Sequence, residues 1–123
     1  RVNEYCQIHF NQQPKTKGEM AYVVYKSLAQ SSKRTILEIE KVVGRRFTTI
    51  NIVGGGSANE FLNQLIADST GLPVYAGPVE ATLLGNIGVQ AITFGVINSL
   101  SELRELISKS FPTQVFYPNE NWA

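Results

Sequence analysis

The chain has 123 residues, 43% of them hydrophobic and 17% charged, with a formal net charge of +1. These values are typical of one ordinary globular domain. A charge so near zero argues against nucleic acid as a partner. No apolar run reaches the roughly 20 residues that cross a bilayer, so we expect no membrane partner. Cys6 is the only cysteine, which excludes an internal disulfide or a cysteine-based zinc site and favours a reducing, cytoplasmic location.

Capping residues and apolar spacing predict two helices before the first strand. The first covers residues 1–10 and is weakly patterned. Thr16 and Glu19 form a capping box at the start of a long helix over 17–43, which Gly44 ends. We expect this long helix to bury one apolar stripe, made of Met20, Val24, Leu28, Ile39, Val42 and Val43.

Short strands alternate with helices in the rest of the chain. The strands are expected over 47–53 and 72–76, and both are apolar enough to be buried on two faces. Helices are expected over 58–70, over 80–94 and over 99–111, the last of them capped by Ser99 and Glu102. The first of these directs four apolar side chains inward, namely Phe61, Leu62, Leu65 and Ile66. This order predicts an α/β fold with a short, mostly parallel sheet flanked by helices.

A sheet of two strands is very narrow. We therefore expect further strands in sequence before Arg1, which makes this chain one part of a longer protein. Such a chain leaves a sheet edge open, through which it could self-associate. The tail between Pro112 and Pro118 is expected to be irregular.

The most informative segment is the turn between the first strand and the helix after it. Gly54, Gly55 and Gly56 end an apolar run, and Ser57 and Asn59 follow. Glycine lets a ligand come close to the main chain, and helix N-terminal amides attract anions. The turn therefore predicts phosphate or nucleoside contacts from backbone amides, Ser57 and Asn59. The alternative is a structural turn in which Ser57 is the helix N-cap.

This turn matches neither of two common nucleotide motifs. No Lys-Ser or Lys-Thr pair follows Gly56, as a P-loop requires. A dinucleotide fingerprint needs a third glycine near the position where Glu60 stands. A second glycine element over 76–86 follows the next strand, so the two turns should lie side by side at the carboxyl edge of the sheet. Within it, we favour capping or bracing of the glycine loop as the role of Glu80.

Groups for acid–base chemistry are scarce. Asp68 is the only aspartate and His9 the only histidine. We expect Asp68 to hydrogen-bond the following loop and assign no catalytic role to His9. The sequence shows neither a metal-ligating cluster nor a nucleophile with its base, so we predict no catalysis by this chain alone. A non-catalytic nucleotide-binding or oligomerisation module is therefore one alternative to part of an enzyme.

Two motifs surround the glycine elements. The first is Gly55-Gly56, Asn59 and Gln64-x-x-Ala67-Asp68, and the second is Pro78-x-Glu80-Ala81-Thr82-x-Leu84-Gly85. Together they resemble the C-terminal part of the FGGY carbohydrate kinases over residues 20–118. The segments VGGGSAN, GLPVYAGPVEAT and LGNIGVQ carry a closer likeness to the rhamnulokinases of that family.

The resemblance implies that residues 1–123 are part of an actin-like, ribonuclease-H-like ATPase domain that binds ATP or ADP, with Mg²⁺ in the full enzyme. Gly55 and Asn59 would contact the nucleotide, while Gly54, Gly56 and Ser57 would shape the turn. The implied reaction is phosphorylation of L-rhamnulose to L-rhamnulose 1-phosphate. The sugar-binding domain and the catalytic aspartate would precede this chain. Another ketose or polyol kinase of the family is the alternative.

Overall fold

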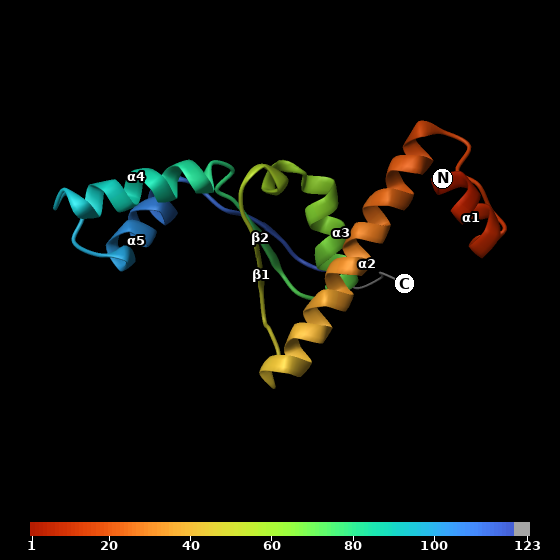
Figure 1. Ribbon diagram of the computed structural model, residues 1–123, viewed down its shortest axis with the longest axis horizontal. Coiled ribbons are helices and arrows are strands. Elements are labelled where there is room, and N and C mark those ends of the chain that lie inside the picture. The colour runs from red at the N-terminus through yellow and green to blue at the C-terminus, as the bar shows by residue number, and fades with distance from the viewer. Residues whose placement is uncertain (120–123) are drawn as a thin grey trace.

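The computed structural model describes residues 1–119, which form an α/β arrangement around a three-stranded sheet (Figure 1). In chain order the elements are α1 (Val2–Phe10), α2 (Lys17–Val43), β1 (Ile50–Ile52), the 3₁₀ helix η1 (Gly55–Ala58), α3 (Glu60–Thr70), β2 (Val74–Ala76), α4 (Ala81–Thr93), α5 (Leu100–Ser110) and β3 (Gln114–Phe116). The predicted α/β class is confirmed. Residues 120–123 of the predicted single domain lie outside the described part. None of the described helices is both long and apolar enough to span a membrane.

The sheet has the strand order β1-β2-β3. β1 and β2 are parallel, with Ile50 opposite Val74, whereas β2 and β3 are antiparallel, with Val74 opposite Phe116. β3 lies between Pro112 and Pro118, so the prediction of an irregular tail was wrong. This strand has only three residues and forms through pairing with β2, a contact that no local pattern encodes. Within residues 1–119, β1 pairs with β2 alone, and further strands beside it remain a prediction.

Helix α3 packs against α2 as well as against β2 and β3. One apolar core joins these elements. Its buried members are Ala29 of α2, Leu65, Ile66 and Ala67 of α3, Val74 and Ala76 of β2, and Phe116 of β3. Burial of apolar surface is the main favourable term in folding. The position of α3 is therefore fixed from both sides, by the sheet and by the long helix.

Two helices begin at the caps that the sequence predicts. At the start of α2, Glu19 N donates to Thr16 Oγ1 over 3.1 Å. At the start of α5, Glu102 N donates to Ser99 Oγ over 3.2 Å. Helix α2 ends at Gly44, whose φ of 67° is in the left-handed region. These ends form as predicted because a cap depends only on residues within one turn of the helix.

The buried face of α2 differs from the prediction. Val24 of the expected apolar stripe is 41% exposed and Val42 is 87% exposed. The buried residues of α2 are instead Ala29 and Glu40. Small Ala29 belongs to the core that contains α3, and Glu40 bonds the chain after the helix. Helix α2 therefore contacts the rest of the fold through Ala29 and Glu40, and the buried face is not the predicted apolar stripe.

Phe61 also lies outside the core, contrary to the prediction. Its side chain is 50% exposed, and its ring centroid lies 5.8 Å from that of Tyr25 and 6.2 Å from that of Tyr22. Leu65 and Ile66 are buried as predicted. The ring of Phe61 thus joins α3 to α2 at the margin of their interface, where aromatic pairs add to the packing.

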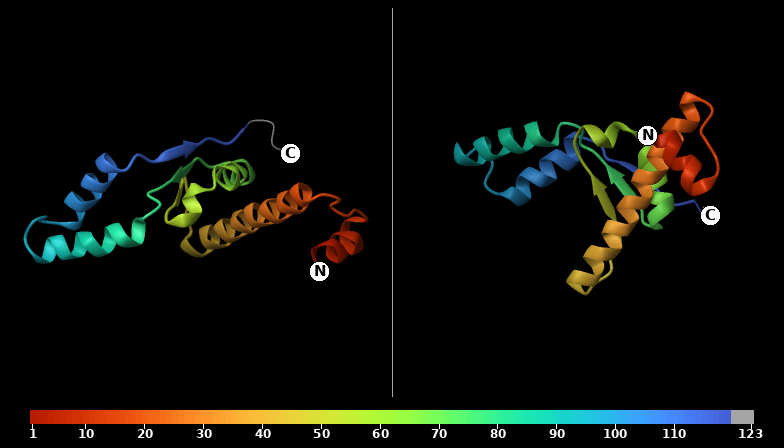
Figure 2. Two further views of the ribbon diagram at one scale, coloured as in Figure 1. Left: turned by 90° about the horizontal axis from the view of Figure 1, so that it is seen from above. Right: turned by 45° about the vertical axis from the view of Figure 1, so that its right-hand side comes forward.

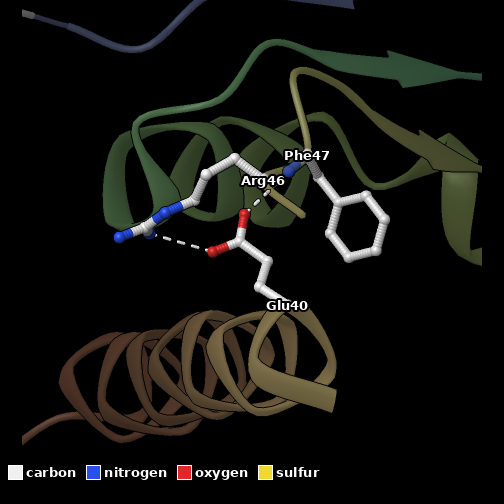
Figure 3. Close-up of polar contacts among 3 residues, drawn as sticks. All are labelled: Glu40, Arg46 and Phe47. Atoms are coloured by element: carbon white, nitrogen blue, oxygen red, sulfur yellow. Dashed lines mark hydrogen bonds and ion pairs between the residues drawn. The ribbon is translucent and has the colours of Figure 1, made fainter. Parts of the chain in front are cut away.

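Glu40 ties the end of α2 to the chain that enters β1 (Figure 3). Its Oε1 accepts a hydrogen bond from Phe47 N over 2.8 Å, and its Oε2 accepts one from Arg46 Nη1 over 2.9 Å. The Glu40 side chain is 9% exposed, whereas that of Arg46 is 83% exposed. The buried carboxylate therefore fixes the loop after α2, and the arginine reaches it from solvent.

Asp68 holds the segment after β3 against α3. Its Oδ1 accepts hydrogen bonds from Asn119 N and from Gln64 Nε2, each over 2.8 Å. Gln64 Nε2 also donates to Tyr117 O over 2.9 Å. A structural role for Asp68 is confirmed, but the prediction placed its partner in the loop after α3, whereas the partner lies after β3.

Helices α4 and α5 form a hairpin that extends away from the sheet, at the opposite end of the molecule from α1 (Figure 2). Gly88 of α4 is buried against Leu103 of α5. A Cβ added at Gly88 would lie 2.5 Å from Leu103 Cδ1 and 2.9 Å from its Cγ, while one added at Gly85 would have no neighbour within 4 Å. Helix α5 therefore approaches α4 closely at Gly88.

Replacing Glu40 by alanine leaves Phe47 N without its buried acceptor. We expect Glu40→Ala to lower the free energy of unfolding by about 1–3 kcal/mol, the usual cost of an unpaired buried polar group. Arg46→Ala is the matched control, because removing an exposed partner costs less than about 1 kcal/mol. Urea denaturation followed by circular dichroism measures both. A larger loss for Arg46→Ala than for Glu40→Ala would contradict the assignment.

The two glycines of α4 give a second test of packing. Gly85→Ala should raise the free energy of unfolding by up to about 1 kcal/mol, because alanine favours helix and meets no neighbour. Gly88→Ala should instead lower it by about 1–3 kcal/mol, the usual cost of overpacking, because the Leu103 side chain must move. Thermal unfolding of the two variants checks the opposite signs. Equal shifts would show that α4 and α5 do not pack closely at Gly88.

Candidate functional site

The two glycine elements meet at the carboxyl ends of β1 and β2. The strands are parallel, with Ile52 opposite Ala76. Past the strand ends, Gly77 N donates to Ile52 O over 2.8 Å, and Gly54 N donates to Pro78 O over 2.9 Å. The predicted placement of the two turns side by side is therefore confirmed. Ligands of open α/β sheets bind at this edge.

The three glycines of the first turn have different structural needs. Gly54 has a φ of 78°, a left-handed conformation that favours glycine. Gly55 and Gly56 are exposed, and a Cβ added at either would meet no atom within 4 Å. The backbone conformation thus explains glycine at position 54. At positions 55 and 56, the absent side chains leave the main chain open to an approaching molecule.

Ser57 closes the turn instead of capping the helix. Its backbone N and its Oγ both donate to Gly54 O, over 2.9 Å and 2.7 Å. The N-cap of α3 is Asn59, whose Oδ1 accepts from Leu62 N over 3.0 Å. The alternative in which Ser57 is the N-cap was wrong, and so was the prediction of a single helix over 58–70. Ser57 lies within the 3₁₀ helix η1, which ends at Ala58, and α3 begins only at Glu60.

Asn63 of α3 supports the same turn and was not among the predicted site residues. Its side chain is 0% exposed, and its Nδ2 donates to Ser57 O over 2.9 Å. The Oδ1 of the same carboxamide is buried without a hydrogen-bond partner. The available signal was a polar residue among the apolar positions of α3, next to Leu62. Only the structure shows that this position faces η1.

The second glycine element has a backbone conformation at Gly77 that favours glycine. Gly77 has a φ of 119°, and a Cβ added there would lie 3.7 Å from Pro112 O. Glu80 occupies the N-cap position of α4, but its exposed side chain makes no capping hydrogen bond. The predicted capping by Glu80 was therefore wrong. Its φ of −92° and ψ of 36° are not the extended conformation in which a side chain usually caps.

The two residues considered for acid–base chemistry, Asp68 and His9, make contacts outside the joined turns. Asp68 is engaged by the segment after β3, and His9 stacks near Tyr5 on α1, with ring centroids 4.2 Å apart. Residues 1–119 contain no group of three or more His, Cys, Asp or Glu side chains that could hold a metal. The joined turns present main-chain amides, together with the carboxamide of Asn59. Such groups suit an anion or a nucleoside.

Comparison with known proteins gives a family match and several similar proteins. Residues 7–94 match the model of the FGGY family of carbohydrate kinases, C-terminal domain. A rhamnulokinase from Mannheimia succiniciproducens is 42% identical over 115 residues, which cover 94% of this chain and 24% of that protein. Rhamnulokinases from Halalkalibacterium halodurans and Bacillus subtilis are 46% and 39% identical, over 89% and 97% of this chain and 24% of each protein.

The chain thus spans about a quarter of the length of these relatives. The family match covers more than half of the chain and includes both glycine elements, so this chain belongs to the FGGY family of carbohydrate kinases.

Proposed function

We propose that this chain supplies the nucleotide-binding part of an ATP-dependent sugar kinase. The observation that carries the proposal is the pair of glycine turns joined at the carboxyl ends of β1 and β2, with open main chain at Gly55 and Gly56. Membership of a carbohydrate kinase family supplies the class of reaction. The nucleotide would be ATP before phosphoryl transfer and ADP after it.

The residues of the turn divide into two roles in this proposal. Gly55 and Asn59 contact the nucleotide, and Gly54, Gly56 and Ser57 shape the turn. The shaping role fits the positive φ of Gly54 and the two hydrogen bonds from Ser57 to its carbonyl. Because Asn59 Oδ1 is engaged in the cap of α3, its Nδ2 is the group that would donate to the base or ribose.

Mg²⁺ would enter this site on the nucleotide phosphates. Phosphoryl transfer depends chiefly on positioning and on stabilising charge. What these turns provide is the positioning of the nucleotide by main-chain amides. We place the sugar site and the base that deprotonates the sugar hydroxyl in the larger part of the relatives' length that this chain does not match. On this proposal the chain has no kinase activity by itself.

The proposed substrate is L-rhamnulose, phosphorylated to L-rhamnulose 1-phosphate. Its support is that the similar proteins are named rhamnulokinases and cover most of this chain at 39–46% identity. A kinase for another ketose or polyol is the alternative within the family. A nucleotide-binding module without catalysis is the alternative outside it.

Nucleotide binding is tested by a substitution at Gly55. We expect Gly55→Val to weaken Mg·ADP binding by at least about 10-fold, or about 1.4 kcal/mol, because the side chain would occupy the space a nucleotide needs. The fold should persist, since a Cβ at Gly55 meets no atom within 4 Å. Isothermal titration calorimetry of the full-length protein gives the affinities, and circular dichroism checks folding. Gly18→Ala at the start of α2 is the control. Unchanged affinity in Gly55→Val would exclude the turn as the nucleotide site.

Substrate identity is tested by kinase assays. The full-length protein with Mg·ATP should phosphorylate L-rhamnulose with a kcat/KM at least about 10-fold above that for other ketoses and polyols, such as D-xylulose and glycerol, because a site that pairs with one pattern of hydroxyl groups discriminates against others. A coupled assay of ADP release measures each rate. Higher kcat/KM on another sugar would favour the first alternative, and turnover on none would favour the second.

A further inference from the structure

We propose that Asn63 is the positioning residue of the glycine turn and thereby sets nucleotide affinity, an inference that rests on the proposed function of that turn. Asn63 is not part of either motif that led to the family. It lies one turn inside α3, and its backbone N donates to Asn59 O over 3.0 Å. Its contribution would be made through Ser57, without contact to the nucleotide.

The turn must be held by hydrogen bonds, because its three glycines have no side chains to pack. Gly54 O accepts both hydrogen bonds from Ser57, and Gly54 N donates to Pro78 O. Ser57 O in turn accepts from Asn63 Nδ2 over 2.9 Å. A continuous series of hydrogen bonds therefore runs from α3, through η1, to the second glycine element. Asn63 is the buried end of that series on α3.

Burial shields this end of the series from water. Asn63 is 0% exposed and Ser57 is 6% exposed, so water does not compete for the bond between them. A hydrogen bond in such surroundings is electrostatically stronger than one in water. Asn63 also stands on the helix that carries Leu65, Ile66 and Ala67 of the core. The hydrogen bond from Asn63 to Ser57 therefore connects the turn that contains Gly55 and Gly56 to the helix that carries these core residues.

The cost of Asn63 indicates a role beyond stability. Its Oδ1 is buried without a partner in the described structure. An unpaired buried acceptor destabilises a fold, and an apolar residue of similar size would remove that penalty. The same replacement would leave Ser57 O without this donor, so the two penalties offset each other and stability alone gives asparagine little advantage. The Nδ2 donor to Ser57 O is the feature that leucine could not replace.

Helix α3 also contains a matched control. Ser69 is 5% exposed, and its Oγ is likewise buried without a partner. It lies near the far end of α3, which ends at Thr70, away from η1. Asn63 and Ser69 therefore share the helix, the burial and the unpaired oxygen. They differ in the hydrogen bond to the turn.

The test compares Asn63→Leu, Asn63→Ala and Ser69→Ala with the wild type in the full-length protein. Calorimetry gives the Kd for Mg·ADP, thermal unfolding gives Tm, and hydrogen exchange without nucleotide gives the protection of amides 55–58. Both Asn63 variants should raise the Kd about 10–100-fold, the scale on which small misplacements act, and speed exchange at 55–58. Ser69→Ala should leave the Kd and these exchange rates at wild-type values. Asn63→Ala decides the matter should Asn63→Leu fail to fold.

If Asn63 only stabilises the fold, the Kd, the Tm and the exchange rates follow a different pattern. In that case Tm falls in the Asn63 variants while the Kd and the exchange at 55–58 stay at wild-type values, which would overturn the proposal. Should Ser69→Ala raise the Kd as much as Asn63→Ala, the effect would belong to α3 in general and the proposal would also fail. A wild-type protein that does not bind Mg·ADP would overturn the proposed function and the affinity claim together. The exchange rates would then still decide whether Asn63 holds the turn.

Discussion

Two hydrogen bonds past the ends of β1 and β2 hold the candidate site together. Gly77 N to Ile52 O and Gly54 N to Pro78 O continue the parallel pairing of the strands into the two glycine turns. Without them, the turns would be independent loops on neighbouring strands. With them, the two turns are joined, and the main chain that leads to Gly55 is fixed by the same pairing that defines the sheet.

The rest of the fold supports that edge. Helix α3 packs on the sheet and on α2, and its core residues fix it between them. From this helix, Asn59 caps the N-terminus and Asn63 reaches the carbonyl of Ser57. Glu40 anchors the other end of β1 by binding Phe47 N (Figure 3). The segments before and after β1 are thus held by side chains from the helices that precede and follow it, which suits the nucleotide site proposed above.

Local signals in the sequence predicted much of this arrangement. The bounds of α2 and the cap at Ser99 depend on neighbouring residues, and the glycines at 54–56 marked the turn directly. The pairing of β3 with β2 was missed because it joins segments far apart in the chain. The buried face of α2 was missed because packing favours the small side chain of Ala29 over more apolar residues. Asn63 was missed because a polar residue within a helix carries no sign of what it faces.

The central claim is that nucleotide binds to the main chain of the joined turns. The most direct measurement is a titration of the ¹⁵N-labelled protein with Mg·ADP, followed through its backbone amide resonances. We expect the largest and saturable shifts at Gly55, Gly56 and Asn59, with smaller shifts at Gly77. Saturable shifts confined to another region, such as the surface between α1 and α2, with none at residues 54–59, would contradict it.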